Sequence, residues 1–221
     1  MKKPQITLAS VVFSLDPESR CLKVLLERGP QGYSLPETSQ DWSKGLKGSV
    51  LSLLEGELES LPLLEQLRTT ASGGPPSDTL TVSYLGLVPV STQTKSGSRC
   101  TWHPLCTGRS VESEPFVRDH AAIINAGVER LQSKIQWQPI GLDLLPLTFT
   151  LTDLQAVYET ILGRALDKRN FRRKVLSYGV LESAESVRIG QPGRPPSLYR
   201  FNREAYEELV QSKGLDFEVK V

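Results

Sequence analysis

The most constraining feature of the sequence is a pair of short helix patterns, joined by a turn of a few residues, in the last third of the chain. Apolar residues recur from Leu154 to Leu162 at the i, i+3, i+4, i+7, i+8 spacing of a core-facing helix. Thr152 with Gln155 has the spacing of a capping box at the start of this helix, and Gly163 supplies its stop. After a three-residue turn, Asp167 is a good N-cap for a second helix.

A β-hairpin is predicted after these two helices. Its strands would be residues 186–190 ("SVRIG") and 197–202 ("SLYRFN"), joined by the turn "QPGRPP" at 191–196. Helix, short turn, helix and hairpin together make the plan of a winged helix-turn-helix. Ahead of the first helix, Pro139 and Pro146 bracket a segment that we predict to be a hinge between two domains.

The second helix is strongly cationic. Five of the seven residues from 168 to 174 are Lys or Arg. Projected at 100° per residue, Phe171, Val175 and Tyr178 fall within one narrow arc and are predicted to face the core. Leu176 does not fit this division and is predicted to lie near the wing. No acidic residue stands four positions after an arginine of this helix to neutralise it, so we expect the cationic side to face outward.

A second helix that follows a short turn is the element that enters the major groove of DNA in helix-turn-helix proteins. Arginine can make two hydrogen bonds to guanine, asparagine can make two to adenine, and other cations neutralise phosphates. A solvated basic face without a ligand is one alternative. An RNA-binding module is another, although stacking aromatic residues are not evident. The residues predicted to contact double-stranded DNA are Lys168, Arg169, Asn170, Arg172, Arg173, Lys174, Arg188, Arg194 and Arg200.

The distribution of charge points to an anionic partner for this segment alone. The chain has a net charge of +1, whereas residues 147–203 hold ten Lys and Arg against five Asp and Glu. The sequence has no run of eighteen or more apolar residues, so we expect no membrane span. Three cysteines, with no C-x-x-C spacing, favour a reducing compartment and predict a cytoplasmic protein.

The first half of the chain has the patterns of strands with one or two helices. Apolar residues predict strands at 6–15, 21–29 and 78–90, and helical spacing predicts a helix within 42–61. A firmer apolar stripe at helical spacing runs from 115 to 135. This stripe would either pack on its own sheet or be shared with a second subunit.

Zinc chemistry is compatible with one part of the sequence. Cys100, His103 and Cys106 stand at three-residue steps and His120 follows, which offers three or four zinc ligands. The alternative, which we favour, is that these residues are structural. The sequence has neither a G-x-S-x-G nucleophile motif nor a G-x-x-x-x-G-K-[ST] phosphate loop. We therefore expect no metal site and no catalytic residue of these kinds.

Two C-terminal stretches, "FTLTDLQAVYETILGRALDKRNFRRKVLSYGVLE" and "GRPPSLYRF", closely resemble the NrtR-type Nudix-related transcriptional regulators. The resemblance extends over most of the chain through "LEQL" at 64–67, "WHP" at 102–104 and "DHAAIINAGVERL" at 119–131. It implies an α/β (α+β) Nudix-like sandwich domain at residues 1–140. A winged helix-turn-helix domain at residues 147–221 would follow it.

The sequence departs from this family at the Nudix catalytic motif. In Nudix hydrolases, carboxylates on a loop and a helix hold divalent cations, Mg²⁺ as a rule, against a diphosphate. The matching segment here is "LLEGELESL" at 53–61, in which only Glu57 coincides with a family carboxylate. Leu58 stands where a second metal-binding glutamate belongs. We therefore expect no hydrolysis. A Nudix-like hydrolase of nucleoside diphosphate derivatives, with an accessory nucleic-acid-binding domain, is the alternative.

The resemblance also implies a repressor that binds a palindromic operator as a homodimer. The N-terminal domain would sense a nucleotide sugar or a sugar-derived effector, and ADP-ribose is the best-known effector of the family, which suggests a role in NAD metabolism. No other cofactor is expected. For the effector site we expect "RGPQGY", with Arg28 for phosphate, Gly32 for close approach and Tyr33 for stacking. An ordinary turn between a strand and a loop is the alternative.

Overall fold

The computed structural model describes residues 5–16, 20–30, 32–72, 79–105, 116–117, 119–184 and 197–213. Contacts divide the chain into two compact units. The first is Met1–Asp16 with Cys21–Arg130, and the second is Pro17–Arg20 with Leu131–Val221. The division falls earlier in the chain than the boundary near residue 140 that the prolines suggest. Among the helices in the described part of the chain, none combines the length and apolarity needed to cross a membrane.

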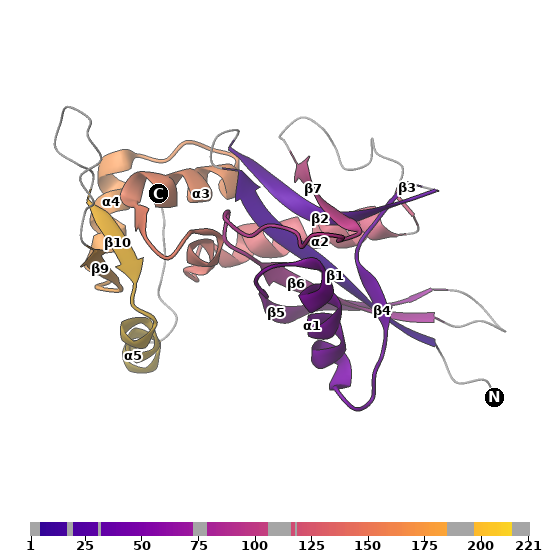
Figure 1. Ribbon diagram of the computed structural model, residues 1–221. Coiled ribbons are helices and arrows are strands. Elements are labelled where there is room, and N and C mark those ends of the chain that lie inside the picture. Colours follow the sequence, from indigo (N-terminus) through magenta and orange to yellow (C-terminus); the bar gives the residue numbers. More distant parts are fainter. Residues whose placement is uncertain are drawn as a thin grey trace. The chain divides into compact units, whose positions relative to one another are not determined.

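The first unit is built on a mixed sheet with two helices (Figure 1). The strands are β1 (Gln5–Asp16), β2 (Cys21–Gly29), β3 (Gly32–Ser34), β4 (Glu37–Ser39), β5 (Leu63–Ser72), β6 (Thr79–Leu87) and β7 (Cys100–Leu105), and the helices are α1 (Gly45–Glu57) and α2 (His120–Lys134). The strand order is β3-β2-β1-β6-β5, with β4 paired to β1 and β7 paired to β2. β1 and β6 are parallel, and the other pairs are antiparallel.

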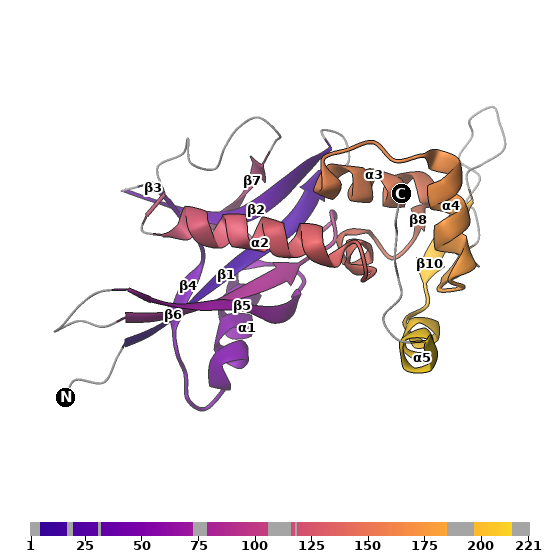
Figure 2. The same cartoon turned by 180° about the vertical axis from the view of Figure 1, so that it is seen from behind.

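The central strand β1 is buried on both faces because a helix covers each face of the sheet. Leu8 and Val12 pack in the same cluster as the apolar side of α1. Side chains alternate along a strand, so the odd-numbered residues of β1 point to the opposite face. There, a Cβ atom added to Gly127 of α2 would lie 3.1 Å from side-chain atoms of Val11 and Phe13. Figures 1 and 2, which view the molecule from opposite sides, show α1 and α2 on the two faces of this sheet.

The local patterns of the first unit match these elements. The strands predicted at 6–15, 21–29 and 78–90 correspond to β1, β2 and β6. On α2, Ile123 and Ile124 are buried, so the apolar stripe packs on the sheet of its own chain.

Cys21 is disulfide-bonded, which differs from the reduced state expected of the cysteines, whereas Cys100 is a buried free thiol.

The second unit contains a pair of short helices and a small antiparallel sheet. Its elements after the end of α2 are η2 (Ile140–Leu144), β8 (Phe149–Thr150), α3 (Leu151–Leu162), α4 (Lys168–Ser177), β9 (Leu181–Ala184), β10 (Leu198–Phe201) and α5 (Arg203–Lys213). The sheet order is β8-β10-β9. In the core, the rings of Tyr158 and Phe171 meet edge to face with centroids 5.2 Å apart, which joins α3 to α4.

The start of α3 corrects the predicted capping box. The N-cap is Thr150, whose side chain accepts from the backbone N–H of Asp153 while the Asp153 carboxylate accepts from Thr150. Thr150 has an extended backbone and pairs with Leu198 in the sheet, so the helix begins directly where strand β8 ends. Thr152 and Gln155 therefore lie inside the helix, and the sequence prediction placed its start two residues too late.

Two further predictions about the second unit need correction. The first strand of the hairpin is Leu181–Ala184, which pairs with β10 in the register Leu181 to Phe201. The predicted strand at 186–190 and the predicted turn at 191–196 lie outside the described residues. The expected hinge is instead the short helix η2, whose residues Leu142 and Leu144 are buried. Buried apolar side chains make this segment part of a packed core.

Candidate functional site

The cationic helix α4 is held by a turn with several hydrogen bonds. Gly163 ends α3 with a left-handed backbone (φ 66°), which a glycine adopts without steric cost. The carboxylate of Glu159 accepts from the backbone N–H of Leu166 at 3.0 Å and from the amide of Gln155 at 2.9 Å. These two bonds lower the pKa of Glu159, the Leu166 N–H having the larger effect. Asp167 then caps α4 by accepting from the N–H of Asn170 at 2.8 Å.

Burial on one side of α4 exposes its cations on the other. Phe171 and Val175 are fully buried, as their spacing predicts. We define the cationic face as the exposed residues Lys168, Arg169, Asn170, Arg173 and Lys174. Among the ion pairs between described residues, none joins an α4 cation to a carboxylate. The charge of this face is therefore directed to solvent.

Two contacts orient side chains within the cationic face. The Arg173 guanidinium donates to the Asn170 side-chain oxygen at 2.9 Å. The Lys174 ammonium lies 5.2 Å from the ring centroid of Tyr178. Arg173 and Asn170 are thus presented together, as one arginine–asparagine pair on the first turns of the helix.

The structure places Arg172 differently from its neighbours. Its Nη2 atom donates to the Thr152 hydroxyl of α3 at 3.0 Å, and its Nε atom is buried. The side chain is half-buried and extends along the start of α3. The geometry therefore gives Arg172 the role of joining the two helices, in addition to any contact that it makes with a ligand.

Leu176 lies in line with two of the exposed arginines. It follows Arg173 by three residues and Arg169 by seven, which is one row along a helix. Its side chain is 44% exposed. The outward surface of α4 therefore includes one large apolar group among its cations.

Of the three hairpin arginines predicted to contact DNA, Arg200 is the one that lies within the described residues. Arg200 is exposed on β10 and is paired in register with Glu182 of β9. The Glu182 carboxylate accepts a hydrogen bond from the Asn202 amide. Arg188 and Arg194, which are also predicted to contact DNA, lie outside the described residues.

In the first unit, the residues predicted for the effector site lie together at the β2–β3 hairpin. Arg28 and Tyr33 face each other across the two strands, and the guanidinium carbon is 6.0 Å from the ring centroid. Gly32 stands at the start of β3 with a φ of 123°. The Tyr33 ring already contacts the rings of His103 (4.3 Å) and Phe116 (6.3 Å). The structure thus assembles an aromatic cluster beside one cation at this turn.

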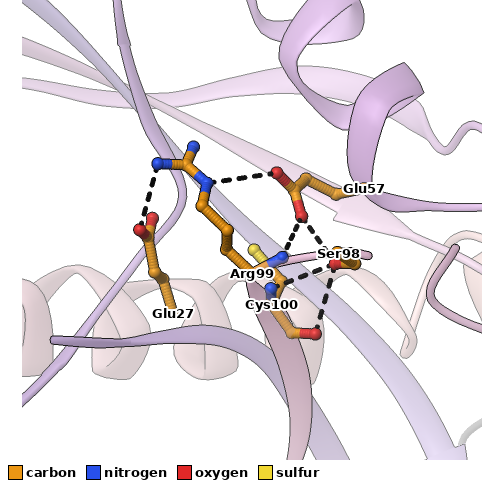
Figure 3. Close-up of polar contacts among 5 residues, drawn as sticks. All are labelled: Glu27, Glu57, Ser98, Arg99 and Cys100. Carbon is orange, nitrogen blue, oxygen red and sulfur yellow. Dashed lines mark hydrogen bonds and ion pairs between the residues drawn. The ribbon is translucent and has the colours of Figure 1, made fainter. Parts of the chain in front are cut away.

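The divalent cation implied by the Nudix resemblance does not fit the residues at α1. Glu57, in the last turn of α1, accepts from the Ser98 hydroxyl at 2.5 Å and from the backbone N–H of Arg99 at 3.0 Å (Figure 3). Burial raises the pKa of Glu57, but these hydrogen bonds outweigh it and the pKa lies below its ordinary value. The described residues contain no group of three or more His, Cys, Asp or Glu that could hold a metal ion.

The described zinc candidates also have structural partners. Burial raises the pKa of the Cys100 thiol to about 12, so this thiol stays protonated. His120 accepts from the backbone N–H of Leu35 through Nδ1 at 2.9 Å and contacts Glu37 through Nε2 at 3.0 Å. His103 bonds Thr101, and Cys106 lies outside the described residues. These contacts favour the structural interpretation.

Sequence reasoning missed the contributions of the loop at 91–99. Lys95 donates through Nζ to the Glu55 carbonyl at 2.7 Å, and its backbone N–H donates to the Glu57 carbonyl at 2.9 Å. Arg99 and Ser98 bind the Glu57 side chain. The sequence shows this loop only as polar, and no local pattern indicates that it contacts residues some forty positions earlier.

A helix-flanked mixed sheet, followed by two short helices and a three-stranded sheet, defines a Nudix-like domain joined to a winged helix domain. Residues 141–201 match the family model of the NrtR DNA-binding winged helix domain. The chain therefore contains an NrtR-type winged helix domain, and over most of its length it is similar to NrtR proteins. The family resemblance and the fold class predicted from the sequence are confirmed.

Three relatives illustrate this similarity. The ADPR responsive transcriptional repressor NtrR of Acinetobacter baylyi is 29% identical over 217 residues, which covers 92% of this chain and 84% of the relative. The crystal structure of Shewanella oneidensis NrtR complexed with a 27mer DNA is 27% identical with a TM-score of 0.77, over 91% of this chain and 95% of that one. A MutT/nudix family protein from Enterococcus faecalis (22% identity, TM-score 0.67, over 91% of this chain and 87% of that one) shares the fold.

Proposed function

We propose that this protein is a sequence-specific DNA-binding transcription repressor. The observation that carries the proposal is the cationic face of α4, held by the Asp167 cap and free of ion pairs to described carboxylates. Support comes from the Shewanella oneidensis relative, which was crystallised with DNA, and from the Acinetobacter baylyi relative, which is named a repressor. Arg169, Asn170 and Arg173 are the proposed base-reading residues, because they are exposed in the first turns of α4.

The assembly and the effector belong to the same proposal. The protein binds a palindromic operator as a homodimer in the cytoplasm, with one α4 helix in each half-site. Its effector is ADP-ribose or a related nucleotide sugar, since the Acinetobacter baylyi relative is named for its response to ADPR. Arg28, Gly32 and Tyr33 line part of the effector site. For the two functional domains we propose residues 1–140 and 147–221, although the compact units divide earlier, between Arg130 and Leu131.

The repressor acts without hydrolysing its effector. The Oε2 atom of the buried Glu57 accepts two hydrogen bonds, and its Oε1 atom faces the Arg99 guanidinium at 3.8 Å, so neither oxygen is open to Mg²⁺. The alternative is a Nudix-like hydrolase that carries an accessory nucleic-acid-binding domain. Incubation of the full chain with ADP-ribose and Mg²⁺ tests this, because our proposal predicts no release of AMP, whereas a hydrolase that acts on this effector releases it.

Fluorescence anisotropy with labelled duplexes tests the DNA-binding role. The probes tile the region upstream of the gene and its neighbours, with a scrambled duplex of equal length. We expect Arg169→Ala and Arg173→Ala to weaken binding to the preferred duplex by about tenfold each and to reduce its advantage over the scrambled one. Lys174→Ala should weaken binding to both duplexes evenly and reduce the salt dependence, because a phosphate contact carries no sequence information.

Lys47→Ala is the charge-matched control for this experiment. Lys47 is exposed on α1, in the other unit, and its loss should leave the affinity unchanged. If the three α4 substitutions lower affinity no more than Lys47→Ala does, then α4 is not the DNA-contacting element.

A further inference from the structure

Two carboxylates of the first unit share one guanidinium. The Arg99 Nη1 atom lies 3.3 Å from Oε1 of Glu27 on β2, and its Nε atom lies 3.8 Å from Oε1 of Glu57 on α1. Figure 3 shows the Arg99 side chain lying between the two glutamates. These residues are far apart in the sequence, so the fold alone brings them together.

The same loop supplies a second cation to the end of α1. The last turn of α1 contains no basic residue of its own, although the carbonyl end of a helix favours positive charge. Lys95 fills this role, because its ammonium binds the Glu55 carbonyl at 2.7 Å. Lys95 and Arg99 therefore bring two positive charges to the C-terminal end of α1. Glu57, at that end, is the residue that coincides with a carboxylate of the family's metal-binding motif.

We propose that Arg99 is the resident cation of this site, in place of a divalent metal. The guanidinium neutralises Glu27 and Glu57 in part and links β2, α1 and the start of β7. Glu57 needs such a partner because only 9% of its side chain is exposed, and an ionised carboxylate in that setting requires compensation. Arg99 can supply it without being buried, since 64% of its own side chain is exposed.

The arrangement makes the first unit independent of divalent cations. Removal of the guanidinium leaves two facing carboxylates, and a pair of carboxylates with an open space between them attracts a hard cation. The variant Arg99→Gln should therefore acquire a response to Mn²⁺ that the wild type lacks. Arg99→Lys, which keeps the charge, should acquire none.

The experiment measures the melting temperature of the full chain in EDTA and in about 10 mM Mn²⁺. We expect Arg99→Gln to melt lower than wild type in EDTA and to regain about 2 °C or more with Mn²⁺, because binding to the folded state stabilises it. Arg130→Gln is the matched control. Arg130 contacts Glu65 in the same unit at the same 3.3 Å separation, but no second carboxylate shares its guanidinium in the described ion pairs.

Two results would overturn the proposal. In one, Arg99→Gln responds to Mn²⁺ no more than Arg130→Gln does. In the other, the wild-type chain itself binds Mn²⁺ in an electron paramagnetic resonance titration and Glu57→Gln abolishes that binding. The second measurement needs only the wild type and Glu57→Gln, so it decides the question even if Arg99→Gln fails to fold.

Discussion

At the scale of single residues, adjacent arginines of α4 make different contacts. Arg173 is exposed and hydrogen-bonded to Asn170, whereas Arg172 is half-buried and bonded to Thr152 of α3. Leu176 is an apolar group in the same exposed row as Arg169 and Arg173. In the major groove, thymine presents a 5-methyl group that accepts apolar contacts. A leucine in this row is suited to such a contact.

Leu176→Ala is predicted to weaken binding to the operator by roughly fourfold, because about one buried methylene-sized contact to thymine is lost. Anisotropy titrations with operators in which single thymines are replaced by uracil would locate the contact. At the contacted position, wild type and Leu176→Ala should bind the uracil duplex equally. A constant difference between the two proteins at every uracil position would show that Leu176 does not contact a thymine methyl.

At the scale of elements, the turn between α3 and α4 determines where the cationic face begins. Gly163, Glu159 and Asp167 each satisfy backbone groups that would otherwise lack partners at a helix end. The apolar anchors Phe171 and Val175 then fix the rotation of α4 about its axis. The cap and the anchors together present the first turn of α4 in one orientation.

Asp167→Ala should destabilise the first turn of α4 by about 1 kcal/mol, because the Asn170 N–H loses its acceptor. Hydrogen exchange of the backbone amides in this turn, measured on the full chain, should become about fivefold faster. Asp167→Asn is the control, since asparagine caps helices about as well as aspartate. Equal exchange rates in the alanine and asparagine variants would contradict a capping role for this side chain.

At the scale of the whole molecule, the proposed function combines effector sensing by one unit with DNA binding by the other, in one chain. Each unit has its own core, so their communication is a coupling free energy between two sites. Thermodynamic linkage makes such coupling reciprocal. An effector that changes the affinity for DNA must have its own affinity changed by DNA in the same proportion.

We therefore predict that saturating ADP-ribose changes the operator Kd by a factor within about 5 to 150, and that saturating operator changes the ADP-ribose Kd by the same factor. Anisotropy gives the first constant and calorimetry the second, with AMP as the control ligand. If ADP-ribose leaves the operator Kd unaltered, then ADP-ribose is not the effector of this protein.

Several elements could be predicted from the sequence because their signals are local. The limits of β1 and β2, the stop at Gly163, the cap at Asp167 and the burial of Phe171 all follow from periodicity and capping within a few residues. The family resemblance supplied the order of the two domains. Such signals act between neighbours along the chain, so they are present before the chain folds.

Other features depend on residues that are distant in the sequence. Thr150 caps α3 where β8 ends, because β8 pairs with β10, and this pairing joins positions almost fifty residues apart. Arg172 turns toward Thr152 only because α3 and α4 pack together. The Glu57–Arg99 contact bridges forty-two positions through a loop whose sequence shows only polarity. Local patterns thus predict helices and strands, whereas the partner of each charged side chain is set by packing.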